Sequence, residues 1–215
     1  MSTSAEPLRV AVLLSGRGSN LGALIDATRA GLTIRIVGAF SNKLDAPGLD
    51  LARGAGIPTA VFEPRDYPDK AAFEAALFAA VAASGADLVV LAGFMRVLTA
   101  GTVEQWRGRL INIHPSLLPK YQGLHTHARA LEAGDTEHGA SVHFVTPVLD
   151  GGPVLMQVRI PVLPQDTADT LAARLLPQEH RLLVAAVRLF AERRVRLDGE
   201  CIVVDGGVLG APLAL

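Results

Sequence analysis

Short apolar runs recur along the first half of the chain, separated by turns rich in glycine, proline or polar residues. Five runs are rich in valine, isoleucine and leucine, which is typical of strands buried on both faces. They cover residues 8–14, 33–40, 58–62, 86–94 and 109–114. Apolar residues at spacings of three and four predict helices at residues 20–31, 49–56 and 70–85. This alternation predicts an α/β fold with a mostly parallel sheet flanked by helices.

The pattern changes in the second half of the chain. Residues 139–164 resemble two strands joined by a Gly-Gly turn with no helix between them, which predicts an antiparallel hairpin. A long helical segment follows, with Asp166 or Thr167 as its N-cap and Pro177 as a kink or break. Residues 196–209 predict a closing hairpin. Without repeats or a linker, residues 1–215 are expected to form one domain with an antiparallel C-terminal extension.

Composition narrows the range of partners. The formal net charge is −1 and 19% of the residues are charged, so no strong field for nucleic acid or an anionic membrane is expected. No apolar run of about 20 residues and no secretory signal is recognisable, so we expect a soluble, cytoplasmic protein. Small molecules are the expected partners, and a homodimer is left open. The only cysteine, Cys201, is expected to be a small apolar filler.

The glycine-rich turn "SGRGSN" leaves the first predicted strand and opens the first helix. Unpaired N–H groups at a helix start attract phosphate. The dinucleotide fingerprint fails because its third glycine falls at Leu21, and no glycine-lysine pair completes a P-loop. The alternative is that the glycines only make a tight turn and Asn20 caps the helix.

An asparagine and a histidine end the fifth predicted strand, in "RLINIH". Because side chains alternate across a strand, Asn112 and His114 are predicted to share one face, at the carboxyl edge where open sheets bind ligands. An amide donor beside an imidazole suits acyl transfer, since one stabilises an oxyanion while the other moves a proton. The alternative is a structural histidine at a strand end.

Asp150 precedes two glycines in "VLDGGPV" and has two interpretations. It forms a turn, or it is a carboxylate that orients His114. The spacing does not decide between them. The other histidines lack metal-ligand spacing, and His125 with His127 would need a third ligand, so no metal site is expected.

Several motifs in order resemble those of the folate-dependent phosphoribosylglycinamide formyltransferases over residues 8–194. They are "SGRGSNL", "FSNK", "VVLAGFMRVL", "NIHPSLLPKYQGLHTH", "ALEAGDTEHGASVHFVTPVLDGGPV" and "QEH". The resemblance implies a Rossmann-like fold without metal. It also implies transfer of a formyl group from 10-formyltetrahydrofolate to the amine of N1-(5-phospho-D-ribosyl)glycinamide, which yields tetrahydrofolate in de novo purine biosynthesis.

The resemblance also implies roles for matching residues. The catalytic asparagine, histidine and aspartate of that family match Asn112, His114 and Asp150. The nucleotide substrate is expected to contact a set of four residues, Gly18, Ser19, Asn20 and Glu179. The folate pocket is expected to include Lys70, Met95, Arg96, Val97, Leu98, Asn112, Thr146, Pro147, Val148, Leu149 and Asp150.

Three alternative functions differ from this one in what they require. Methionyl-tRNA formyltransferase would need a further RNA-binding domain and positive charge. Formyltetrahydrofolate hydrolase normally carries a regulatory domain and has no need for a phosphate loop. A nucleotide-binding module without catalysis would not need Asn112, His114 and Asp150 together.

Overall fold

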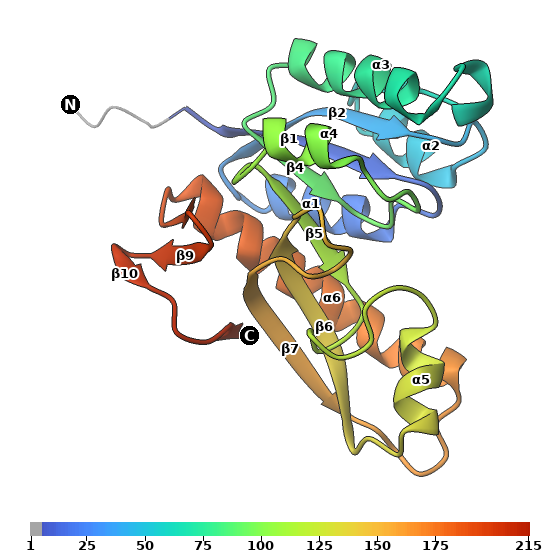
Figure 1. Ribbon diagram of the computed structural model, residues 1–215, viewed down its shortest axis with the longest axis vertical. Helices are drawn as coiled ribbons and strands as arrows, with labels where there is room; N and C mark the ends of the chain where they lie inside the picture. The colour runs from blue at the N-terminus through green and yellow to red at the C-terminus, as the bar shows by residue number, and fades with distance from the viewer. Residues whose placement is uncertain (1–5) are drawn as a thin grey trace.

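The computed structural model describes residues 6–215 and has an eight-stranded sheet at its centre (Figure 1). The strand order is β11-β7-β6-β5-β4-β1-β2-β3. The parallel part consists of β1 (Leu8–Leu14), β2 (Ile34–Ser41), β3 (Thr59–Val61), β4 (Leu88–Leu91) and β5 (Leu110–His114). The predicted Rossmann-like, mostly parallel sheet is therefore confirmed.

The antiparallel part begins where β6 (Glu137–Phe144) pairs with β5. β7 (Val154–Pro161) then pairs antiparallel with β6, as the hairpin pattern predicts. The short β11 (Leu213–Ala214) adds to the outer edge of β7. A separate small sheet holds β8 (Val195–Asp198), β9 (Cys201–Val204) and β10 (Gly207–Val208), so the closing hairpin is confirmed and gains a third strand.

Helices cover both faces of the sheet. They are α1 (Ser19–Arg29), α2 (Pro47–Gly54), α3 (Lys70–Ala83), α4 (Ala100–Gln105), α5 (Thr126–Glu132) and α6 (Ala168–Ala191), with a 3-10 turn at Pro64–Asp66. Val10, Val12 and Leu14 of β1 pack in the core with α1 and α6. Ala11 and Leu13 face the other core, with α3. Burial on both faces explains why β1 is a continuous apolar run.

Some local predictions are wrong. The helix does not break at Pro177, since α6 runs unbroken from Ala168 to Ala191. Thr167, not Asp166, is its N-cap, and the capping box pairs it with Thr170. Cys201 is exposed on β9 rather than buried as a filler. The short α4 and α5 were not predicted, because six or seven residues carry too little periodicity.

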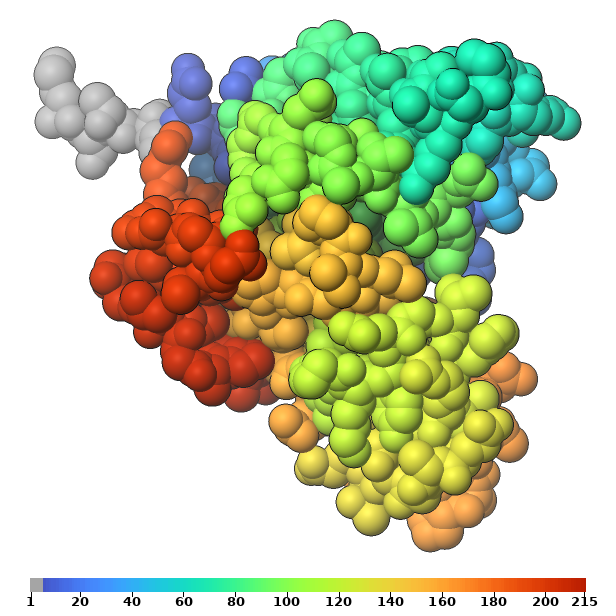
Figure 2. All heavy atoms as spheres, in the orientation of Figure 1, coloured from blue at the N-terminus to red at the C-terminus, as the bar shows by residue number. Residues whose placement is uncertain are grey.

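The molecule divides visibly into a body and a lobe. Figure 2 shows the yellow-green segment that carries α5 protruding away from α3, and α5 packs against α6. The loop between β5 and α5 therefore lies at the junction of lobe and body (Figure 1). Within residues 6–215, no helix combines the length and the apolar character needed to cross a membrane.

Candidate active site

The register of the sheet collects the catalytic candidates at one edge. Asn112 on β5 lies opposite Leu91 of β4 on one side and His143 of β6 on the other. His114, two residues further, ends the strand and is 6% exposed. The connection from β6 to β7 carries Asp150 back over this edge. The structure thus brings Asn112, His114 and Asp150 together, although 38 residues separate the first from the last.

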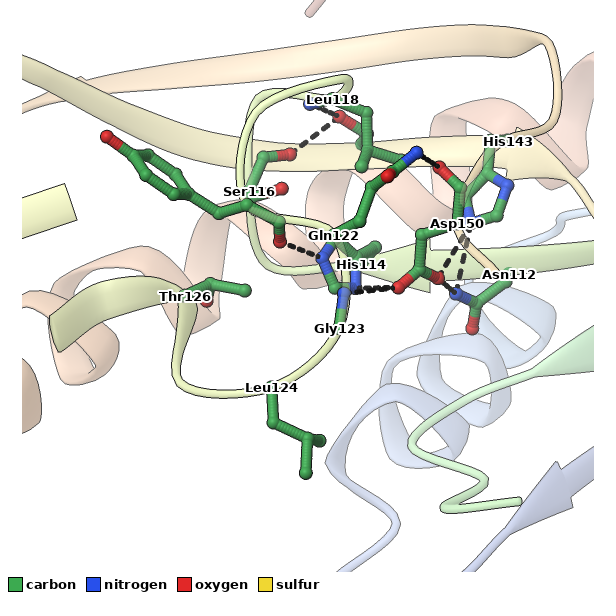
Figure 3. A network of polar contacts seen from close by, with 12 residues as sticks. Asn112, His114, Ser116, Leu118, Gln122, Gly123, Leu124, Thr126, His143 and Asp150 are labelled. Atoms are coloured by element: carbon green, nitrogen blue, oxygen red, sulfur yellow. Dashed lines mark hydrogen bonds and ion pairs between the residues drawn. The ribbon is translucent and has the colours of Figure 1, made fainter. Parts of the chain in front are cut away.

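Asp150 is the hub of the cluster (Figure 3). Its Oδ2 accepts a hydrogen bond from the Gly123 amide at 2.9 Å and lies 3.5 Å from Nδ1 of His114. Its Oδ1 lies 3.4 Å from Nδ2 of Asn112 and 3.6 Å from Nε2 of His143. Asp150 also has a φ of 48°, and the Gly151 amide donates to the Val148 carbonyl, so it occupies a turn as well. The turn predicted from the sequence is therefore confirmed, and the carboxylate also lies beside His114, as its proposed role requires.

The charge of Asp150 is stabilised by its neighbours. Burial is the largest single influence on the pKa of Asp150 and raises it, but the hydrogen bond from the Gly123 amide and the two nearby imidazoles, His114 and His143, together outweigh it. The net effect lowers the pKa of Asp150. Asp150 is therefore ionised at neutral pH.

His114 is a buried imidazole held between two acceptors. Its Nε2 lies 2.9 Å from the Tyr121 carbonyl, which can only accept, so Nε2 carries the hydrogen. Burial lowers the pKa of His114, against the raising effects of the Tyr121 carbonyl and Asp150. Without substrate the ring is therefore neutral at pH 7. Its lone pair is on Nδ1, beside the Asp150 carboxylate.

His143 is a site residue that sequence reasoning missed. Its Nδ1 donates to the Phe144 carbonyl at 2.9 Å, which leaves Nε2 as an acceptor for the Asn112 amide at 3.1 Å. Flipping the Asn112 amide would point its carbonyl at Asp150 and is unfavourable. In Figure 3 the Asn112 oxygen accordingly points away from the cluster. Only the pairing of β6 with β5 places His143 beside Asn112, and the residues that pair across these strands cannot be read from the sequence.

A cavity opens beside Asn112 and Asp150. Most residues assigned to the folate pocket line it, namely Arg96, Val97, Leu98, Asn112, Thr146, Pro147, Leu149 and Asp150. Apolar side chains complete the wall, including Leu91 and Val103, and His143 joins the polar side. An apolar wall with a few converging polar groups fits a flat heteroaromatic ligand. His114 does not line this cavity and lies one contact further in, beside Asp150.

Three residues assigned to the folate pocket do not line the cavity. Met95 and Val148 are 63% and 65% exposed at its mouth. Lys70 lies at the start of α3, with its Nζ 3.8 Å from the buried carboxylate of Glu74. Contacts from these three would have to reach a part of the ligand outside the cavity.

The glycine-rich loop forms the start of α1. Gly18 is the N-cap with a φ of 74°, and no side chain caps the helix, so the alternative in which Asn20 serves only as the cap does not hold. A Cβ on Gly18 would lie 2.5 Å from the Gly48 Cα, so only glycine fits between the loop and α2. The leading amides of α1 lack partners within the helix and can bind an anion.

Asn20 instead reaches the second nucleotide candidate, Glu179 on α6. Burial raises the pKa of the Glu179 carboxyl to about 7, and the nearby Asn20 side chain lowers it by less. The Asn20 Oδ1 is buried and has no partner within residues 6–215. Packing of α1 on α6 therefore brings the glycine-rich loop close to "QEH".

Metal ligands do not gather in the described chain. Within residues 6–215, no group of three or more histidine, cysteine, aspartate or glutamate side chains is arranged to hold a metal ion. His127 and His138 pack edge to face, with ring centroids 5.0 Å apart. Burial lowers the pKa of both, that of His138 to about 4.

Comparisons of the sequence with known proteins identify the family to which the chain belongs. The family model described as formyl transferase matches residues 8–187. Phosphoribosylglycinamide formyltransferase of Escherichia coli strain K12 is 47% identical over 202 residues, covering 93% of this chain and 94% of that protein. The enzyme of the same name from Haemophilus influenzae is 41% identical, covering 94% of this chain and 95% of its own length.

Solved structures give the same result. Phosphoribosylglycinamide formyltransferase of Coxiella burnetii, in complex with CHES, superposes with a TM-score of 0.95 at 45% identity, covering 98% of this chain and all of that one. Formyltetrahydrofolate deformylase of Burkholderia mallei superposes with a TM-score of 0.83 at 35% identity. It covers 92% of this chain but only 70% of its own, so the deformylase has a substantial part without counterpart here.

Proposed function

Since the chain belongs to the phosphoribosylglycinamide formyltransferases of the formyl transferase family, we propose that Asn112, His114 and Asp150 carry its reaction. The enzyme transfers a formyl group from 10-formyltetrahydrofolate to the amine of N1-(5-phospho-D-ribosyl)glycinamide. The products are the N-formyl nucleotide and tetrahydrofolate, and the step belongs to de novo purine biosynthesis. Both substrates are small molecules.

The observation that carries the proposed mechanism is the position of the His114 ring, between the Tyr121 carbonyl and the Asp150 carboxylate. Attack of the substrate amine on the formyl carbon gives a tetrahedral oxyanion and an amine that must lose a proton. A neutral His114 accepts that proton at Nδ1 through water, since the ring lies behind Asp150 and does not line the cavity. The adjacent Asp150 carboxylate then stabilises the imidazolium, which protonates the leaving folate nitrogen. The carbon–nitrogen bond to folate breaks as the carbonyl reforms, so one proton and one formyl group are transferred in each turnover.

The proposed role of Asn112 is to stabilise the oxyanion. Its two N–H bonds point to His143 and Asp150, and the contact with Asp150 is the longer, at 3.4 Å. A formyl oxygen in the cavity would compete for that weaker contact, while His143 holds the amide in place. A preorganised amide donor is a common means of stabilising such an oxyanion.

The nucleotide is proposed to bind across α1 and α6. Its phosphate would accept hydrogen bonds from the amides around Gly18 and Ser19, and the exposed Arg17 adds positive charge. The orphan Asn20 Oδ1 would accept a hydrogen bond from a hydroxyl or amine of the substrate, beside Glu179. These placements put the glycinamide between the phosphate loop and the catalytic cluster.

The folate pocket is proposed to use the cavity residues together with Lys70, Met95 and Val148 at its mouth. The cationic side chains Lys70 and Arg96 would pair with carboxylates of the folate tail. We also propose that the chain acts as a single domain in the cytoplasm, where its exposed lone cysteine would stay reduced. A net charge of −1 favours neither nucleic acid nor a membrane as partner, and sedimentation would test whether a homodimer forms.

The test is a formyl-transfer assay with three acceptors: N1-(5-phospho-D-ribosyl)glycinamide, initiator methionyl-tRNA and water. We expect rapid transfer to the ribonucleotide only. The similarity to the deformylase makes water the relevant second acceptor. Hydrolysis of the donor at an equal rate without the ribonucleotide would contradict the proposed roles.

A further inference from the structure

Ser15 is the first residue after β1, and its hydrogen bonds connect two loops of the site. Its amide donates to the Gly93 carbonyl at 3.0 Å, and its hydroxyl accepts from the Met95 amide at 2.8 Å. Both partners lie on the loop between β4 and α4 that leads into the folate cavity. Ser15 itself continues directly into Gly16 and the phosphate loop.

The orientation of the Ser15 hydroxyl is fixed. It donates its hydrogen to Oδ1 of Asn42, the residue that follows β2, and both side chains are buried, at 6% and 7% exposure. Because the hydrogen is committed to Asn42, the oxygen lone pairs face the Met95 amide. Replacing either partner would leave a buried polar group unpaired.

The segment Met95–Leu98 has few other hydrogen bonds, although the Leu98 side chain is buried in the core that includes α3. Among residues 6–215, Ser15 is the only side chain hydrogen-bonded to it. The next residue, Thr99, is held by the buried carboxylate of Glu74, which accepts from its amide and its hydroxyl. Side-chain hydrogen bonds therefore hold this part of the folate pocket at two points, from Ser15 at Met95 and from Glu74 at Thr99. Of these two residues, only Ser15 is next to the loop proposed to bind the nucleotide.

We propose that Ser15 is a positioning residue that couples the two substrate sites. This inference rests on the proposed placement of the nucleotide at α1 and of folate at residues 95–98. The phosphate loop is also held on its other side, where the Gly48 amide donates to the Gly16 carbonyl at 3.0 Å. A ligand that fixes the loop therefore fixes Ser15, and with it the Met95 amide. Thermodynamic linkage requires the reverse effect to be equal.

The coupling is measured by titrating N1-(5-phospho-D-ribosyl)glycinamide calorimetrically, with and without saturating tetrahydrofolate. Tetrahydrofolate carries no formyl group, so no turnover interferes. We expect tetrahydrofolate to tighten nucleotide binding by about 5-fold, the scale of one buried hydrogen bond. In Ser15→Ala the ratio should fall to about 1. Ser41→Ala is the matched control. Ser41 is a buried serine that ends the neighbouring β2, but its hydroxyl hydrogen-bonds the backbone of Lys43 rather than a residue of the loop between β4 and α4.

A second measurement needs no variant. Amide hydrogen exchange followed by NMR should slow at Met95 when the nucleotide alone is added, while Thr99, held by Glu74, stays unchanged. A coupling ratio in Ser15→Ala equal to that of the wild type would overturn the proposal, as would unchanged exchange at Met95. If the wild-type enzyme failed to bind the nucleotide or tetrahydrofolate at all, the proposed substrate sites themselves would be wrong.

Discussion

The two ends of the active site are built in different ways. The end proposed to bind the nucleotide consists of backbone groups of one continuous segment, the loop and first turn of α1, where the conformation of Gly18 decides the geometry. The end proposed to carry out catalysis consists of buried side chains from β5, β6 and the connection after β6. These side chains contact one another, so a change in the charge of one affects its neighbours. Changes at the first end should therefore alter substrate affinity, and changes at the second should alter turnover.

The largest effect is expected for the residues proposed to touch the reacting atoms. Asn112→Ala and His114→Ala should each lower kcat by about 10²-fold or more, the range for an oxyanion donor or a general base. His114 is the last residue of β5 and Asn112 is only half-buried, so the melting temperature should change little. Steady-state kinetics with both substrates measures the effect. Near-normal kcat in either variant would remove that residue from the mechanism.

His143 should have a smaller effect, because it acts through Asn112. His143→Ala removes the acceptor of the Asn112 amide and should lower kcat by about 10-fold, as expected for one buried hydrogen bond. The KM for the nucleotide should stay the same. His143→Gln is the control, since its amide oxygen can still accept. An equal loss in both variants would show that packing, not the hydrogen bond, matters here.

The nucleotide end should show the opposite kinetic signature. Gly18→Ala places a Cβ against Gly48 at positive φ and should raise the KM for the nucleotide by about 5-fold or more, with a smaller change in kcat. Gly56→Ala is a matched control, because Gly56 has a similar φ of 72° but open space around it. Similar KM values in the two variants would mean that the close approach of the loop to α2 is unimportant.

The last prediction concerns stability rather than kinetics, namely how the melting temperature depends on pH through Glu179. Its pKa is raised to about 7 in the folded enzyme, so the stability it contributes is present below about pH 4.5 and is lost as pH rises through 7. Glu179→Gln abolishes this loss. The variant should therefore melt higher than the wild type at pH 8, relative to their difference at pH 4, by up to roughly 6–12 °C, or about 3 kcal/mol, the energy that corresponds to this pKa shift. A difference in melting temperature that does not vary with pH would show that Glu179 is ionised normally.

The same contrast explains what could be predicted from the sequence. The alternation along β1 and the pair Asn112 and His114 are local patterns, and both were correctly placed. The glycine-rich turn at the start of α1 was predicted correctly, but the sequence does not show that Gly18 is the N-cap, because packing against Gly48 decides its conformation. His143 is invisible without the β5–β6 register. The helix through Pro177 shows tertiary packing prevailing over a local helix-breaking signal.

The central claim is that His114 is neutral in the free enzyme and that the Asp150 carboxylate stabilises its protonated form. NMR titration of the His114 ring in the wild type and in Asp150→Asn tests it most directly. We predict a His114 pKa below 6.5 in the wild type, because burial is the dominant influence, and a still lower pKa in the variant, because the favourable carboxylate is gone. A His114 pKa above 6.5 in the wild type, or one that does not fall in Asp150→Asn, would contradict the account.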